Sequence, residues 1–227
     1  MRQTLIFDAD DTLWENNVVF ERVIDDYLDW LAHPTLDRAE LRSILDDIER
    51  ANAAAHGYGT KVFLRSLHEC VARLRERPTT EHEERRILEL ADQLVNHEIE
   101  LIPGVAETLD ELAARHDLLL LTKGDDEEQQ RKIDASDLDQ HFASVHIVRE
   151  KDTGTYRQLV EEHSLRPERA WMIGNSPKSD IVPARRAGLN AVYIPNESTW
   201  VLEHDVVDPA DDRVLHLTRF PDLLAHF

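Results

Sequence analysis

The chain has a single cysteine, Cys70, and no long hydrophobic run. One cysteine cannot form an internal disulfide, and its amphipathic surroundings indicate a thiol packed in a core. No apolar stretch approaches the roughly 18–20 residues that a membrane-spanning helix needs. Met1-Arg2-Gln3 leads directly into a short apolar run, so we expect no secretion signal. We therefore expect a cytoplasmic protein with an ordinary hydrophobic core, which the 41% of hydrophobic residues can supply.

Lysine is scarce in this chain, whereas negative charge is abundant. Only five lysines stand among the 26 basic residues, at positions 61, 123, 132, 151 and 178. Against 46 acidic residues they leave a formal net charge of −20. A field of this sign repels nucleic acids and anionic membranes, so we expect neither as a partner. It also means that a site for an anionic substrate needs a cation placed locally.

Internal repeats and low-complexity linkers are also lacking, and the 227 residues exceed the usual ~150 of one domain. In residues 15–99, four consecutive segments carry apolar residues at helical spacing, which predicts a small helical bundle. Residues 1–14 and 100–227 instead alternate short apolar runs with helical stretches. This alternation predicts a doubly wound, Rossmann-like α/β core, a parallel sheet covered on both faces, with the helical domain inserted after its first strand.

Two carboxylates, Asp8 and Asp10, follow the first apolar run. Strand residues two apart point the same way, and open α/β sheets bind ligands at the carboxyl ends of their strands. Like charges this close resist joint ionisation, so one tends to keep a proton at neutral pH. One carboxylate can then act as a nucleophile while the other acts as acid and base.

Three further motifs follow predicted strands in order. The run Leu118–Leu121 ends in Thr122, Lys151 precedes a predicted helix, and Gly174–Asp180 reads Gly-Asn-Ser-Pro-Lys-Ser-Asp. Together with the D-x-D-x-T run at residues 8–12, this series resembles the four motifs of the haloacid dehalogenase (HAD) superfamily of hydrolases. The resemblance covers the whole α/β core and is to the phosphatase branch whose helical cap follows the first strand. It implies that residues 15–99 form a cap that closes over the site and selects the leaving group.

The resemblance implies a phosphatase that hydrolyses a small phosphate monoester through an aspartyl-phosphate intermediate. Asp8 would be the nucleophile, and Asp10 would protonate the leaving oxygen and later deprotonate water. Thr122 would donate a hydrogen bond to a phosphoryl oxygen. Lys151 would supply the local cation that the net charge makes necessary.

The resemblance also implies a Mg²⁺ ion held by Asp8, the backbone carbonyl of Asp10, Asn175 and Asp180, because Mg²⁺ prefers oxygen ligands. Asn175 departs from the family pattern, which has a carboxylate at this position. An amide oxygen can bind Mg²⁺ but carries no charge, so we expect a lower metal affinity. Asp180 then becomes the main carboxylate of the fourth motif.

Each of these residues has an alternative, structural role. Thr122 and Asp180 could cap the helices that follow them, and Lys151 could be an ordinary exposed lysine. Lys123 competes with Lys151 for the cationic role and is a candidate for substrate binding. Asn16, near the expected hinge of the helical domain, is another candidate for substrate binding.

Asp10 favours phosphate esters over halogenated substrates, because a halide leaving group needs no proton. A phosphomutase acting on a sugar phosphate would keep the same residues, and a catalytically idle module that binds a phosphorylated ligand is the alternative outside enzymes. An intact nucleophile and acid favour an enzyme over such a module. The twelve histidines show no H-x-x-x-H or E-x-x-H spacing, so the sequence predicts no transition-metal site. It leaves the substrate's identity and the oligomeric state open.

Overall fold

A computed structural model describes residues 2–95 and 98–227, and the chain divides into two compact units. The core unit comprises Met1–Asn17 and Ile99–Phe227, and the helical unit comprises Val18–Glu98. The sequence had placed residues 15–17 with the helices, but the core unit holds them. The N–H of Glu15 donates to the Glu100 carbonyl, and the Asn17 amide donates to the Ser198 carbonyl at 2.6 Å.

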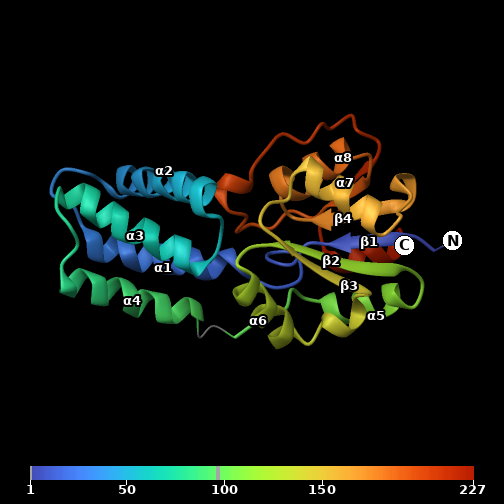
Figure 1. The fold of residues 1–227 in the computed structure, drawn as a ribbon, viewed down its shortest axis with the longest axis horizontal. Helices are drawn as coiled ribbons and strands as arrows, with labels where there is room; N and C mark the ends of the chain where they lie inside the picture. The colour runs from blue at the N-terminus through green and yellow to red at the C-terminus, as the bar shows by residue number, and fades with distance from the viewer. Residues whose placement is uncertain (1, 96–97) are drawn as a thin grey trace. The chain divides into compact units, whose positions relative to one another are not determined.

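The core unit is built on one parallel sheet (Figure 1). Among the described residues, six strands lie in the order β3-β2-β1-β4-β5-β6. Their bounds are β1 Thr4–Phe7, β2 Asp117–Lys123, β3 Ser144–Val148, β4 Ala170–Gly174, β5 Asn190–Tyr193 and β6 Val214–His216. From β1 the chain first adds strands on one side and then on the other, so the strand order reverses beside β1. Ligands of such sheets bind at this reversal, outside the carboxyl ends of the strands.

Helices cover both faces of the sheet, with α7 and α8 on one side and α5 and α6 on the other (Figure 1). The bounds of these helices are α5 Val105–Ala113, α6 Asp126–Ser136, α7 Thr153–Glu162 and α8 Val182–Arg186. Because both faces are covered, the strands are apolar on both. In β1, Leu5 and Phe7 belong to the hydrophobic cluster of α5, whereas Ile6 belongs to that of α7 and α8. The predicted doubly wound α/β fold is confirmed.

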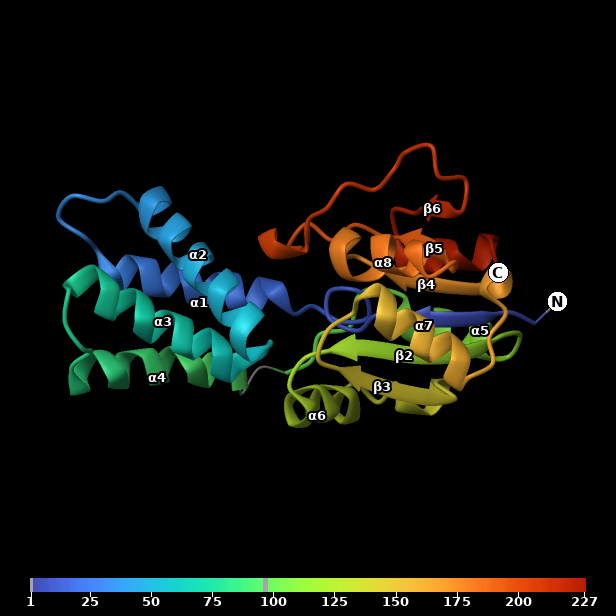
Figure 2. The ribbon, with the colours of Figure 1, turned by 45° about the horizontal axis from the view of Figure 1, so that its top comes forward.

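The helical unit contains the four helical segments that the apolar spacing indicates, which lie alongside one another in Figure 2. They are α1 Asn17–Leu31, α2 Arg38–His56, α3 Thr60–Arg75 and α4 Glu81–Val95. Their apolar faces share one core that includes Tyr27, Leu45, Leu67 and the buried thiol of Cys70. That this unit acts as a cap stays a prediction. In the part of the chain that the structure describes, every helix is too short or too polar to cross a membrane.

Candidate active site

The carboxyl ends of the central strands bring the first two predicted motifs to one edge of the sheet. Phe7, the last residue of β1, is in register with Leu120 of β2 and Ile173 of β4. Asp8 is the first residue beyond β1, and its N–H donates to the Ile173 carbonyl at 2.9 Å. Thr122 lies two residues beyond Leu120, at the end of the neighbouring strand. The parallel register therefore places both side chains at the edge where such sheets bind ligands.

Lys151 joins the first motif to the fourth. Its ammonium forms an ion pair with Asp8 and lies 2.7 Å from Oδ1 of Asp180. Lys151 is only 3% exposed and Asp180 is fully buried. A buried charge is tolerated only when it is paired, because its desolvation costs several kcal/mol. Lys151 is therefore a buried cation between two carboxylates, and the alternative of an exposed lysine is wrong.

The charges around Lys151 do not balance. Burial raises the pKa of Asp8 to about 7, and the Asp180 carboxylate acts in the same direction against the effect of Lys151. Burial alone would lower the pKa of Lys151, but the two carboxylates outweigh it and raise this pKa above its ordinary value. One ammonium thus faces two carboxylates, and the excess negative charge favours a further cation beside them.

Asp180 lies in a π-helical turn, η3, Pro177–Ile181, which follows β4 after two residues. Its Oδ2 accepts a hydrogen bond from the Ser176 N–H at 2.9 Å. A Cβ atom at Gly174 would lie 2.2 Å from this oxygen, so only glycine leaves room for the carboxylate. Helix α8 has no side-chain cap at its start. Asp180 is therefore not the N-cap of α8, but its bond to the Ser176 N–H does secure the start of the helical run 177–186, beside its ion pair with Lys151.

Thr122 is linked to Asp10 through a residue that no motif marks. The side-chain amide of Gln129 donates to the Thr122 hydroxyl at 2.6 Å and to Oδ2 of Asp10 at 3.3 Å. Helix α6 is capped by Asp125, whose carboxylate accepts the Glu128 N–H, so the alternative capping role of Thr122 is wrong. Gln129 lies within a polar helical segment, so nothing in the sequence marks it as a residue of the site.

Three side chains hold the Asp10 carboxylate, which is 25% exposed. Besides Gln129, the Trp14 indole donates to Oδ1 at 2.7 Å, and the Lys132 ammonium lies 3.0 Å from Oδ2. Lys132 also donates to the side-chain oxygen of Asn16 at 2.8 Å. Sequence reasoning missed Trp14 and Lys132, because an indole near a strand and a lysine in a polar helix are ordinary. The predicted contact of Asn16 with substrate stays a prediction.

Oxygen atoms from separate segments converge beside Asp8. The Thr12 hydroxyl lies 3.0 Å from Oδ2 of Asp8 and 3.3 Å from Oδ1 of Asn175. The Asn175 amide nitrogen donates to the Thr199 hydroxyl at 3.0 Å, so the amide oxygen is the atom that faces the Thr12 hydroxyl. With Asp180 these groups form an oxygen-only donor set with excess negative charge. Such a set fits Mg²⁺.

Lys123 forms a second ion pair at this edge of the sheet, with Glu203. Its ammonium lies 2.6 Å from Oε1 of Glu203 and 2.7 Å from the Ser179 hydroxyl. The hydroxyls of Ser176 and Ser179 also donate to Oε2 of Glu203. Burial alone would raise the pKa of Glu203, but Lys123 and the hydroxyls outweigh it and lower this pKa to about 2. The pair fastens the turn that carries Asp180, and substrate binding by Lys123 stays a prediction.

A family model described as haloacid dehalogenase-like hydrolase matches residues 3–188, most of the chain. The chain belongs to this family. The hydrolase prediction is thereby confirmed.

Solved structures and a curated relative extend this HAD assignment. A haloacid dehalogenase-like family hydrolase from Xanthomonas campestris is 28% identical, with a TM-score of 0.83 over 99% of this chain and 94% of that chain. An L-2-haloacid dehalogenase from Xanthobacter autotrophicus, 16% identical, shares the fold, with a TM-score of 0.65 over 98% of this chain and 97% of that chain. A phosphoserine phosphatase from Thermus thermophilus is 33% identical over 82 residues, which are 34% of this chain. The match spans 33% of that relative's length.

Replacing Gly174 by alanine tests the space that Asp180 occupies. We expect Gly174→Ala to lower the free energy of unfolding by about 3–5 kcal/mol, because the added Cβ displaces the Asp180 carboxylate from its buried partner Lys151. Urea denaturation followed by circular dichroism measures this change. In the control Gly154→Ala, the new Cβ would lie 3.0 Å from Oδ1 of Asp152, the exposed N-cap of α7 that accepts the Thr155 N–H, so we expect a loss of at most about 1 kcal/mol from this cap. A change below about 1 kcal/mol in both variants would contradict the inferred crowding.

The Glu203 ion pair predicts a pH-dependent contribution to stability. Its pKa in the folded protein, about 2, lies below the ordinary 4.5, so its contribution is present above pH 4.5 and is lost as the pH falls toward 2. At pH 7 we expect Glu203→Gln to lower the free energy of unfolding by about 3 kcal/mol. The difference from wild type should shrink below pH 4.5. Glu168→Gln, at an exposed position, serves as the control and should behave as wild type at every pH.

Proposed function

We propose that the protein is a Mg²⁺-dependent phosphatase that hydrolyses small phosphate monoesters through an aspartyl-phosphate intermediate. The observation that carries the proposal is the buried Asp8 carboxylate paired with Lys151 at the carboxyl end of the central strand. A module that only binds phosphate needs the cation but not the carboxylate, which repels an anionic ligand. The partial match to a phosphoserine phosphatase supports the same reaction.

The proposed reaction has two displacements at phosphorus. In the first, an Asp8 oxygen forms a bond to phosphorus while the ester P–O bond breaks, and Asp10 gives its proton to the departing oxygen. In the second, water attacks the phosphorus of the acyl phosphate while Asp10 takes its proton. The bond between phosphorus and Asp8 then breaks, which releases inorganic phosphate and restores the carboxylate.

Thr122 and Lys151 can bind the phosphoryl group while it is transferred. The Thr122 hydroxyl accepts its bond from Gln129, so its own hydrogen can be donated to a phosphoryl oxygen. Lys151 stays protonated and provides a fixed positive charge next to Asp8. Fixed donors of this kind stabilise charge that develops in the transition state without reorganising.

The metal proposal rests on the donor set beside Asp8. Asp8, Asn175 and Asp180 would hold Mg²⁺, and the Asp10 carbonyl is the further ligand that the family resemblance implies. When bound, the ion offsets the repulsion between an anionic nucleophile and an anionic substrate. This local cation would offset the negative field of a chain whose net charge of −20 otherwise disfavours an anionic substrate.

Asp10 separates phosphate chemistry from dehalogenation on this fold. The fold is shared with a haloacid dehalogenase, so the fold alone does not choose the reaction. An alkoxide leaving group needs a proton, whereas a halide does not. Trp14 and Gln129 hold the Asp10 carboxylate in place, as a group that must protonate a leaving oxygen requires.

We expect the wild-type protein to release phosphate from an activated aryl phosphate with Mg²⁺ and not with EDTA. Asp8→Asn should lower this rate by at least about a thousandfold, because it removes the nucleophile but keeps its shape. Asp126→Asn, at an exposed position, is the matched control and should keep full activity. Substantial Mg²⁺-dependent release by Asp8→Asn would contradict the nucleophile assignment. No release by wild type, with transfer of labelled phosphate between substrate molecules, would indicate a mutase instead.

Asp10→Asn tests the proton transfer separately. The variant should hydrolyse alkyl phosphates about 10²–10⁴-fold more slowly than wild type, since their leaving oxygens need a proton. With p-nitrophenyl phosphate, whose leaving group departs as an anion, the first step should be slowed much less. Burst-phase kinetics isolates this step from the later attack by water. An equal loss for both substrates in the first step would contradict the general-acid role.

A further inference from the structure

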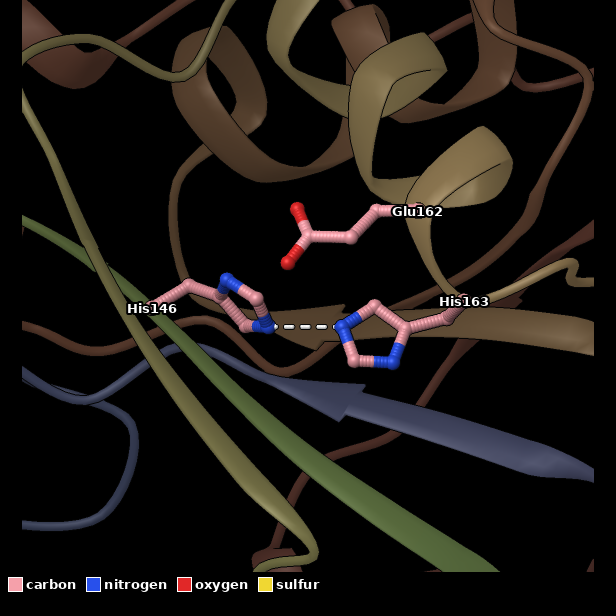
Figure 3. Close-up of side chains that lie close together, drawn as sticks. All are labelled: His146, Glu162 and His163. Carbon is pink, nitrogen blue, oxygen red and sulfur yellow. Dashed lines mark hydrogen bonds between the residues drawn. The ribbon is translucent and has the colours of Figure 1, made fainter.

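A second group of metal-ligating side chains lies on the flank of the core unit. His146 is in β3, which forms one edge of the sheet. Glu162 is the last residue of α7, and His163 follows it directly. Figure 3 shows the two imidazoles and the carboxylate turned toward one another. One ligand atom from each residue can be chosen so that all three lie within 4.8 Å of one another.

The two histidines point their Nε2 atoms at each other. These atoms are 2.8 Å apart, with the rings nearly perpendicular and their centroids separated by 4.9 Å. At this distance one nitrogen must donate a hydrogen and the other must accept it, so the two rings share one proton. The Ser144 hydroxyl lies 3.0 Å from the same nitrogen of His146. A cation that prefers imidazole nitrogen can take the place of the shared proton.

The dimensions of the group suit a tetrahedral metal ion. With Zn–N bonds of about 2.0–2.1 Å, two nitrogens of a tetrahedral ion lie about 3.3 Å apart. The Nε2 atoms, now 2.8 Å apart, would have to separate by about 0.5 Å, and the rings would have to turn so that both lone pairs point at the ion. Two imidazoles and one carboxylate are a ligand set that Zn²⁺ accepts, with a fourth position left for water. Burial lowers the pKa of His146 from its ordinary value, which favours the neutral ring that metals bind.

We propose that His146, Glu162 and His163 form a second metal site, which binds Zn²⁺ or a similar divalent transition metal. The ligands come from an edge strand and from the end of the neighbouring helix, so an ion there would fasten α7 to β3. Helix α7 begins two residues after Lys151, and its Tyr156 hydroxyl donates to the Ser179 carbonyl. The ion would therefore stabilise the helix that follows the buried lysine. This site does not depend on the proposed phosphatase reaction.

The test is a calorimetric titration of the full chain with Zn²⁺ in excess Mg²⁺, which competes for the oxygen donors around Asp8. We expect one Zn²⁺ to bind per chain under these conditions. The double variant His146→Gln/His163→Gln should lose this binding. His226→Gln, which removes an exposed histidine of the same unit, is the control and should bind as wild type.

Glu162→Gln provides an independent variant, because Glu162 is exposed and its substitution does not endanger folding. We expect it to weaken Zn²⁺ binding at least about tenfold. Zn²⁺ should also raise the midpoint of thermal unfolding of wild type by a few degrees, but not that of the double variant. Unchanged Zn²⁺ binding in both Glu162→Gln and the double variant would overturn the proposal. So would wild-type protein that binds no Zn²⁺, which would leave a hydrogen-bonded histidine pair only.

Discussion

The buried ion pairs of Lys151 are the constraint on which the rest of the site depends. The ammonium lies between the carboxylates of Asp8, directly after β1, and Asp180, in the turn that follows the adjacent strand β4. Removing Lys151 would leave two buried carboxylates without a counter-charge, a change that costs several kcal/mol. The strand register, the space left by Gly174 and the turn after β4 all serve to bring these charges together.

Most of the few lysines in this chain lie near the candidate active site. Three of the five lysines, Lys123, Lys132 and Lys151, are directed into ion pairs around the carboxyl edge of the sheet, and their side chains are 13% exposed or less. Each neutralises a carboxylate that would otherwise repel the others. A chain with a net charge of −20 thus places three of its 26 basic side chains at the edge where an anionic substrate would bind.

The chemistry of the site is carried by side chains rather than by the fold. Related sheets support dehalogenases and phosphatases alike, so the strand order cannot distinguish their reactions. In the proposed reaction, the distinguishing group is a second carboxylate, Asp10, together with the groups that hold it. Trp14 and Gln129 fix its position by hydrogen bonds, and Gln129 connects it to the Thr122 hydroxyl. A leaving oxygen bound at this edge would therefore meet a carboxyl group whose position is already fixed.

The sequence by itself determined the α/β fold, the inserted helices and the order of the four motifs, because apolar periodicity and strand ends are local properties of the chain. It did not reveal Gln129, Lys132 or Glu203 as parts of the site, since these polar residues look ordinary in their helices and loops. Nor did it reveal the pair of His146 and His163, which are separated by 17 positions and fit no metal motif. Only tertiary packing brings such residues together, since their contacts depend on which helix covers which strand and not on their spacing along the chain.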